Sequence, residues 1–157
     1  MRYLVTIVFA LVAAQSAIAD QKSEYESAVA KWTAASIRSY TFTYRWHGAV
    51  VIAPACADAA IEVRVRDGVG GPPTVVRGNP RCPRGTRGEK AIGFPVPSTI
   101  DEAFREMLRY IADPPTPVRI TASYDQRFGV PTSYFVEKLG FEDNDEGFKI
   151  LDFEVAK

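Results

Sequence analysis

The sequence has few of the residues from which catalytic and metal sites are built. Its 157 residues include one histidine and two cysteines. A zinc site takes four protein ligands, or three and a water, so this set is poor for zinc, and we expect no metal and no cofactor. The sequence also lacks G-x-S-x-G, G-x-G-x-x-G and P-loop motifs; residues 68–72 are glycine-rich but join two predicted strands and open no helix. The histidine, His47, lies on the polar side of a predicted strand, and we interpret it as exposed.

An excess of charge of either sign is missing too. The chain has 19 basic and 19 acidic residues and a formal net charge of +0. A balanced charge gives no long-range attraction to nucleic acid or to anionic lipid, so we expect no nucleic-acid partner. Beyond the N-terminus no segment is apolar enough to span a membrane.

Residues 1–19 have the three parts of a signal peptide. Arg2 gives a positive start, residues 4–14 form an apolar run, and Ala17 and Ala19 match the A-x-A site that signal peptidase cleaves. The alternative, a retained membrane anchor, is less favoured because a span needs ~20 apolar residues and the run ends before that. We predict cleavage near Ala19, a periplasmic or secreted location, and one domain over residues 20–157.

The two cysteines are Cys56 and Cys82, 26 residues apart. In an oxidising compartment such a pair usually forms a disulfide. A redox or nucleophilic thiol is the alternative, but it would need a neighbouring base or a C-x-x-C spacing, and neither is present. We predict a structural disulfide.

Two helices are predicted from capping boxes and periodicity. Ser23 and Glu26 open a helix over residues 23–36, and Thr99 and Glu102 open one over residues 98–112. The second helix should bury an apolar stripe, with Met107 beside it. The stripe is made of Ile100, Phe104, Leu108 and Ile111.

Strands are predicted where apolar and polar residues alternate. They cover residues 39–52, 60–66, about 74–76, 118–124, 132–138 and 148–155, the last with Leu151, Phe153 and Val155 on one side. Residues 77–97, rich in proline and glycine, should be irregular, and residues 142–147 a hairpin loop. The fold class is therefore α+β: an antiparallel sheet with two helices on one face, in the order α-β-β-β-α-β-β-β.

Several segments together resemble a known family. They are Trp32, residues 39–42 (SYTF), 65–68 (VRDG), 99–104 (TIDEAF), 123–132 (SYDQRFGVPT), 145–147 (DEG) and 152–153 (DF). This set resembles DUF6174, a bacterial family of exported proteins and lipoproteins, over most of the mature chain. The resemblance implies an exported location and this fold, and it implies no activity.

The 124–131 turn is the first candidate for a ligand site. Tyr124 and Asp125 could hydrogen-bond a ligand, while Gly129 can adopt positive φ and Pro131 sets the entry to the next strand. A tight turn, with Asp125 bonded to its own backbone, needs the same residue types, and we favour that interpretation.

The polar face of the sheet is the second candidate. Arg45, Arg64 and Arg66 should project from it and contact a partner. The basic loop, with Arg77, Arg81, Arg84, Arg87 and Lys90, could bind an anion, although a simple loop tied by Cys82 is favoured. The acidic residues 142–147 do not fit an EF-hand loop, because Phe153 would take the place of the bidentate carboxylate.

Because no complete catalytic set is present, we expect a non-catalytic exported protein that binds an envelope protein or a small ligand. Two alternatives stay open. One is a periplasmic hydrolase that uses carboxylates near Asp125, and the other is a structural component of the envelope.

Overall fold

The computed structural model describes residues 20–48, 54–114, 117–140 and 145–156. It confirms the α+β class, with a first helix at residues 20–35. The elements that follow are β1 (Tyr40–Gly48), β2 (Ala60–Arg66), β3 (Val69–Gly70), β4 (Thr74–Arg77), α2 (Glu89–Ile92), α3 (Ile100–Ala112), β5 (Val118–Tyr124), β6 (Pro131–Lys138) and β7 (Glu146–Val155).

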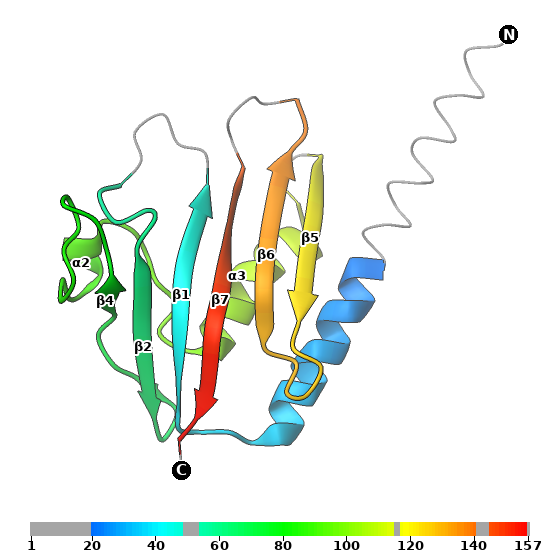
Figure 1. Cartoon of the computed structure of the whole chain (residues 1–157). Helices are drawn as coiled ribbons and strands as arrows, with labels where there is room; N and C mark the ends of the chain where they lie inside the picture. Colours follow the sequence, from blue (N-terminus) through cyan, green and yellow to red (C-terminus); the bar gives the residue numbers. More distant parts are fainter. Residues whose placement is uncertain (1–19, 49–53, 115–116, 141–144, 157) are drawn as a thin grey trace, which may run out of the picture.

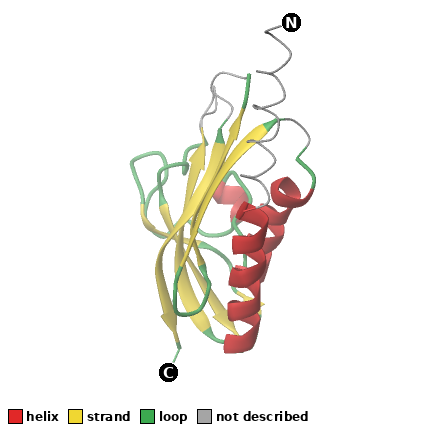
Figure 2. Ribbon diagram, turned by 90° about the vertical axis from the view of Figure 1, so that its right-hand side faces the viewer, coloured by secondary structure: helices red, strands yellow, loops and turns green. Residues whose placement is uncertain are grey.

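In the described residues all seven strands form one antiparallel sheet. Its order is β3-β2-β1-β7-β6-β5, and β4 pairs with the same edge of β2 as β3. The last strand therefore lies in the middle, between β1 and β6 (Figure 1). Seen from the side, the first helix and α3 lie on the same face of the sheet (Figure 2). The other face carries no helix within the described ranges, and we call it the bare face.

The core lies between the sheet and these two helices. Phe42, Ile61, Val63 and Val136 are fully buried on the helix side of their strands. Such alternation of apolar and polar residues is expected of a sheet with one covered face. Helix positions are fixed by polar contacts as well, since the Tyr25 hydroxyl donates to the Phe104 carbonyl at 3.1 Å.

The start of α3 shows why a helix begins there. The Thr99 side chain accepts from the Glu102 amide at 3.1 Å, as the predicted capping box requires. The Glu102 carboxylate then accepts from the Ser98 amide and hydroxyl, both at 2.7 Å, and not from the amide of Thr99. A third bond ties this end to the sheet, because the Ile100 amide donates to the Tyr40 hydroxyl at 3.0 Å.

The start predicted for the first helix is wrong. The helix already includes residue 20, so Ser23 lies inside it and does not cap it. The S-x-x-E pattern is compatible with a helix interior, and nothing in residues 20–22 prevents helix formation.

The predicted stripe of α3 is wrong at Leu108, which is 41% exposed. Ile100, Met107 and Ile111 define the middle of the buried stripe, and Leu108 lies at its margin. Ala103 takes part in the core, where the sequence pattern gave it no role.

The predicted face of the last strand is only partly right. Phe148 and Ile150 are buried, whereas Leu151 is 40% exposed and Phe153 is half-buried. Phe42 pairs with Phe153 but Tyr44 pairs with Ile150, so β7 has one extra residue there. Such a bulge reverses the alternation, which a strict period of two does not predict.

Strand ends and connections differ in smaller ways. β1 ends at Gly48 where 39–52 was predicted, and residues 49–53 lie outside the described residues. β6 begins at Pro131 and β7 at Glu146, slightly before the predicted starts. The two-residue β3 was not predicted, and the supposedly irregular 77–97 stretch contains α2. Of the predicted 142–147 hairpin loop, residues 142–144 lie outside the described residues, and residues 146 and 147 belong to β7.

Candidate functional site

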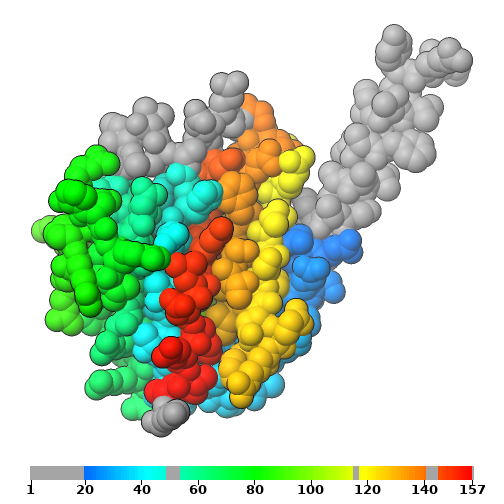
Figure 3. Space-filling view, in the orientation of Figure 1, coloured from blue at the N-terminus to red at the C-terminus, as the bar shows by residue number. Residues whose placement is uncertain are grey.

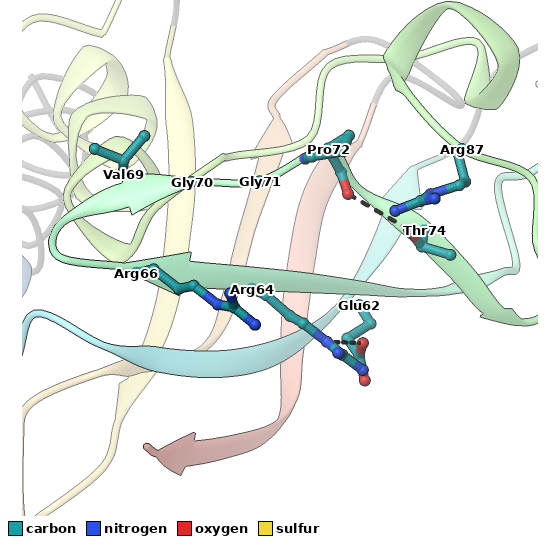
Figure 4. Close-up of a pocket in the computed structure, with 9 residues that line it drawn as sticks. All are labelled: Glu62, Arg64, Arg66, Val69, Gly70, Gly71, Pro72, Thr74 and Arg87. Atoms are coloured by element: carbon teal, nitrogen blue, oxygen red, sulfur yellow. Dashed lines mark hydrogen bonds and ion pairs between the residues drawn. The ribbon is translucent and has the colours of Figure 1, made fainter. Parts of the chain in front are cut away.

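A hollow of about 530 Å³ lies at the β2 edge of the bare face. We call it the arginine hollow. Its lining residues are Glu62, Arg64, Arg66, Val69, Gly70, Gly71, Pro72, Thr74 and Arg87. Figure 4 shows that Glu62, Arg64 and Arg66 project from one side of β2, as their spacing of two predicts, and that Arg87 reaches toward Thr74 from a different segment.

Residues 69–74 form a strap along the edge of β2. The Gly71 amide donates to the Arg64 carbonyl at 2.8 Å, and β3 pairs with Val65 and Arg66. A Cβ on Gly70 would stand 2.1 Å from the Ser98 carbonyl oxygen. Only glycine permits this approach, which fixes the strap against the loop before α3.

The basic loop is fastened to the strap at several points. The Gly88 amide donates to the Pro73 carbonyl at 2.9 Å, and Thr74 and Arg87 form an isolated β-bridge. The predicted disulfide between Cys56 and Cys82 is confirmed and anchors the preceding part of the loop. The backbone of Arg87 is therefore held at the hollow before any ligand arrives.

The charges in the hollow are unequal. Three arginines face one carboxylate, Glu62, which pairs with Nε of Arg64 at 2.7 Å. Across the described ranges, Arg66 and Arg87 take part in no ion pair. Their guanidinium groups, and the terminal nitrogens of Arg64, are donors available to an anion.

The structure separates Arg45 from the other two predicted arginines. Arg64 and Arg66 line the hollow, but Arg45 lies on β1 opposite Lys149 of β7. Its Nε is shielded from solvent and has no hydrogen-bond partner among the described residues. Arg45 thus belongs to the bare face but not to the hollow.

The bare face as a whole is moderately basic. Strand register places five cations on it, against the carboxylates of Glu62, Glu137 and Glu154. The cations are Arg45, Arg64, Arg66, Arg119 and Lys149. Arg119 is paired with Glu137 at 2.7 Å, as Arg64 is with Glu62. Figure 3 shows this face, with β1, β7 and β6 side by side and no helix over them.

The 124–131 turn is held by its own hydrogen bonds. Asp125 Oδ2 accepts from the Phe128 amide at 2.6 Å, and the Gly129 amide donates to the Asp125 carbonyl at 2.9 Å. Gly129 has φ +77, and a Cβ there would stand 2.3 Å from the Ala28 carbonyl oxygen on the first helix. Pro131 is buried at the start of β6. These contacts support the turn interpretation of Asp125 and Gly129.

A second hollow, of about 310 Å³, lies between this turn and the first helix, and Tyr124, Asp125 and Gly129 line it. The Tyr124 ring stacks on Phe104, with centroids 6.5 Å apart. Burial raises the pKa of the Tyr124 phenol above its usual range, and the nearby carboxylate of Glu24 raises it further. Tyr124 is thus a neutral packing residue there.

The single histidine lies apart from the arginine hollow. His47 is exposed on the bare face, its ring 5.2 Å from that of Phe135. Among residues 20–48, 54–114, 117–140 and 145–156, no group of three or more His, Cys, Asp or Glu residues could hold a metal ion. In the same ranges no helix has both the length and the apolar character of a membrane span.

The sequence does not predict two polar residues of the hollow as site residues, namely Glu62 on β2 and Thr74 in the strap. Arg87 was noted only as one of several basic residues of the long loop. The charge of that loop was a signal, but its position beside β2 depends on long-range pairing that local patterns do not contain.

Comparison with known families identifies the family of this chain. No curated protein and no solved structure matches the chain. The family model of DUF6174, described as a family of unknown function, matches residues 24–155. These include the sheet, the first helix from residue 24 onward, α3 and the arginine hollow. The chain therefore belongs to the DUF6174 family.

Proposed function

We propose that this protein is an exported, non-catalytic binding protein whose bare sheet face binds a ligand that carries negative charge. The observation that carries the proposal is the arginine hollow, which is lined by three arginines and a single carboxylate, and in which only Arg64 is paired with that carboxylate. Arginine is well suited to such a task because its planar fork binds carboxylates and phosphates through two parallel hydrogen bonds. The chain has no net charge, so it does not attract anions over its whole surface, but a local cluster of cations can still attract an anion.

Export is supported by two independent features. The first 19 residues have the pattern of a signal peptide, and Cys56 and Cys82 form a disulfide, as is usual in oxidising compartments. Mass spectrometry of the protein recovered from the periplasm and the medium tests this part. We expect a mature N-terminus near Asp20; an intact Met1 in all fractions would contradict it.

The hydrolase alternative receives less support from the geometry. One oxygen of Asp125 is already engaged by the Phe128 amide, which is the role of a turn residue. Glu24 lines the same hollow, but both it and Lys31 stand on the exposed side of the first helix. A water-excluding site around two carboxylates, which would tune their acidity, is not formed by these groups.

The binding test uses fluorescent poly-L-glutamate and poly-L-lysine as charge probes for the mature protein. We expect poly-L-glutamate to bind at low salt, with affinity reduced about tenfold in an Arg64→Gln, Arg66→Gln double variant. The matched control is Arg81→Gln with Arg84→Gln, which removes the same charge from exposed loop positions outside the hollow. Equal loss in both double variants, or preference for poly-L-lysine, would contradict the proposal. No binding at all would favour a structural component.

A further inference from the structure

The arginine hollow has the features of a site for one small molecule, beyond general attraction for anions. Its volume of about 530 Å³ falls in the range of ligand sites, ~300–1,000 Å³. Its floor is formed by β2 and by the strap of residues 69–74 that pairs along it, and Arg87 lies at the β4 end (Figure 4).

The walls are fixed before binding. The strap is hydrogen-bonded to β2 through Gly71 and to the basic loop through Pro73, and it is packed against Ser98 through Gly70. A ligand therefore has to order only the arginine side chains, and not the backbone. Preorganisation of this kind improves affinity because less entropy is lost on binding.

The donors define the chemistry of the ligand. Arg66 and Arg87 have no ion-pair partner in the described part of the chain, whereas Arg64 is held at Nε by Glu62, which leaves its two terminal nitrogens free. Guanidinium groups that approach from β2 and from the loop match an acceptor with several oxygens of shared negative charge. Val69, which is 71% exposed, and Pro72 add apolar surface for the organic part of such a molecule.

We infer that the arginine hollow binds a small organic oxyanion, whose carboxylate or phosphate groups are bound by Arg66 at the β3 end and by Arg87 at the β4 end, with Arg64 between them. This inference rests on the proposed function, because it names the ligand class for the same face. Glu62 is a positioning residue here, because its carboxylate holds Arg64. Its negative charge also lowers the affinity of the hollow for an anion.

Calorimetric titration of the mature protein with citrate, inorganic phosphate and pyrophosphate, at low and high salt, tests the inference. We expect at least one of them to bind, about tenfold more weakly in Arg66→Gln with Arg87→Gln and unchanged within about twofold in Arg81→Gln with Arg84→Gln. A preference for citrate points to a carboxylate ligand, and a preference for the phosphates to a phosphorylated one.

A Glu62→Gln variant gives an effect of opposite sign. Removal of the one carboxylate should tighten anion binding about threefold, an increase that partial unfolding does not produce. Amide NMR shifts on titration should be largest at Gly70 and Gly71. No binding of any of the three anions, or equal binding by the Arg66, Arg87 variant, would overturn the inference. The proposed function is tested separately. If the small anions do not bind but poly-L-glutamate binding still depends on Arg64 and Arg66, the inference of a small-molecule site is wrong and the proposed function stands.

Discussion

At the residue scale, single side chains join the helices to the sheet and fix the helix ends. Glu102 is the clearest example of a side chain that fixes a helix end. One of its carboxylate oxygens accepts two hydrogen bonds from Ser98 at the start of α3. The hydrogen bonds from the Ser98 hydroxyl and amide lower the pKa of the Glu102 carboxyl. A carboxylate at the first turn is favoured by the helix dipole as well.

We predict that this carboxylate makes stability depend on pH. Because its pKa is lower in the folded state, its contribution is present above the unfolded pKa and is lost as pH falls through the folded pKa. In urea unfolding at neutral pH, Glu102→Gln should cost about 0.5–1 kcal/mol, a modest value for a partly exposed group. The difference from wild type should shrink as pH falls from neutral through the lowered pKa of Glu102, because the carboxylate then becomes protonated. A difference that is constant over this range would contradict the assignment.

Gly129 is the residue where the turn touches the first helix. We predict that Gly129→Ala lowers the free energy of unfolding by about 2–4 kcal/mol, because positive φ and a clash with the Ala28 carbonyl add together. Gly85→Ala is the control, since Gly85 has φ +92 but nothing lies within 4 Å of its Cβ position. Thermal unfolding of both variants separates the cost of positive φ, which both share, from the cost of the clash with Ala28, which only Gly129→Ala has. Equal losses would mean that the close approach to Ala28 does not matter.

At the element scale, α3 shows how far sequence patterns reach. The capping box and the helix range were predicted nearly as observed, because both depend on residues close in sequence. The prediction that Leu108 is buried is wrong. Leu108 lies at the margin of the apolar stripe, where burial depends on the position of the neighbouring strands and not on helical periodicity. The bulge in β7 escaped prediction for a similar reason, because it depends on pairing with β1.

Two adjacent residues of α3 test which face of the helix is buried. Met107→Ala should cost about 2–5 kcal/mol, because its side chain is fully buried, whereas Leu108→Ala should stay within about 0.5 kcal/mol of wild type. Chemical denaturation of the two variants gives both values under the same conditions. A larger loss at Leu108 would show that the helix is rotated from the position described.

At the scale of the whole molecule, strand order decides where the site is. The sequence predicts most strands and the fold class, but the central place of β7 and the strap beside β2 follow from long-range pairing. Of the predicted site residues, Arg64 and Arg66 come together with Arg87, while Arg45 lies apart and Asp125 holds its own turn. Local alternation could place arginines on one face of β2, but only the folded chain brings the loop arginine to them.

The two layers also explain why binding is assigned to the bare face. Both long helices cover the opposite face, where the apolar core is completed, so the polar face is available to solvent over the described part of the sheet (Figure 2). The positive charge of this face gathers at its β2 edge, and there the backbone is fastened by the strap and, through the basic loop, by the disulfide. A rigid rim with adaptable arginines suits recognition of an anion.

The central claim is that the arginines of the hollow, and not the overall charge, bind an anionic ligand. The most direct measurement is the affinity for poly-L-glutamate of the Arg64→Gln, Arg66→Gln variant beside that of the Arg81→Gln, Arg84→Gln variant, which has the same net charge. We predict that only the first variant binds more weakly, by about tenfold. Equal affinities in the two variants would contradict the claim.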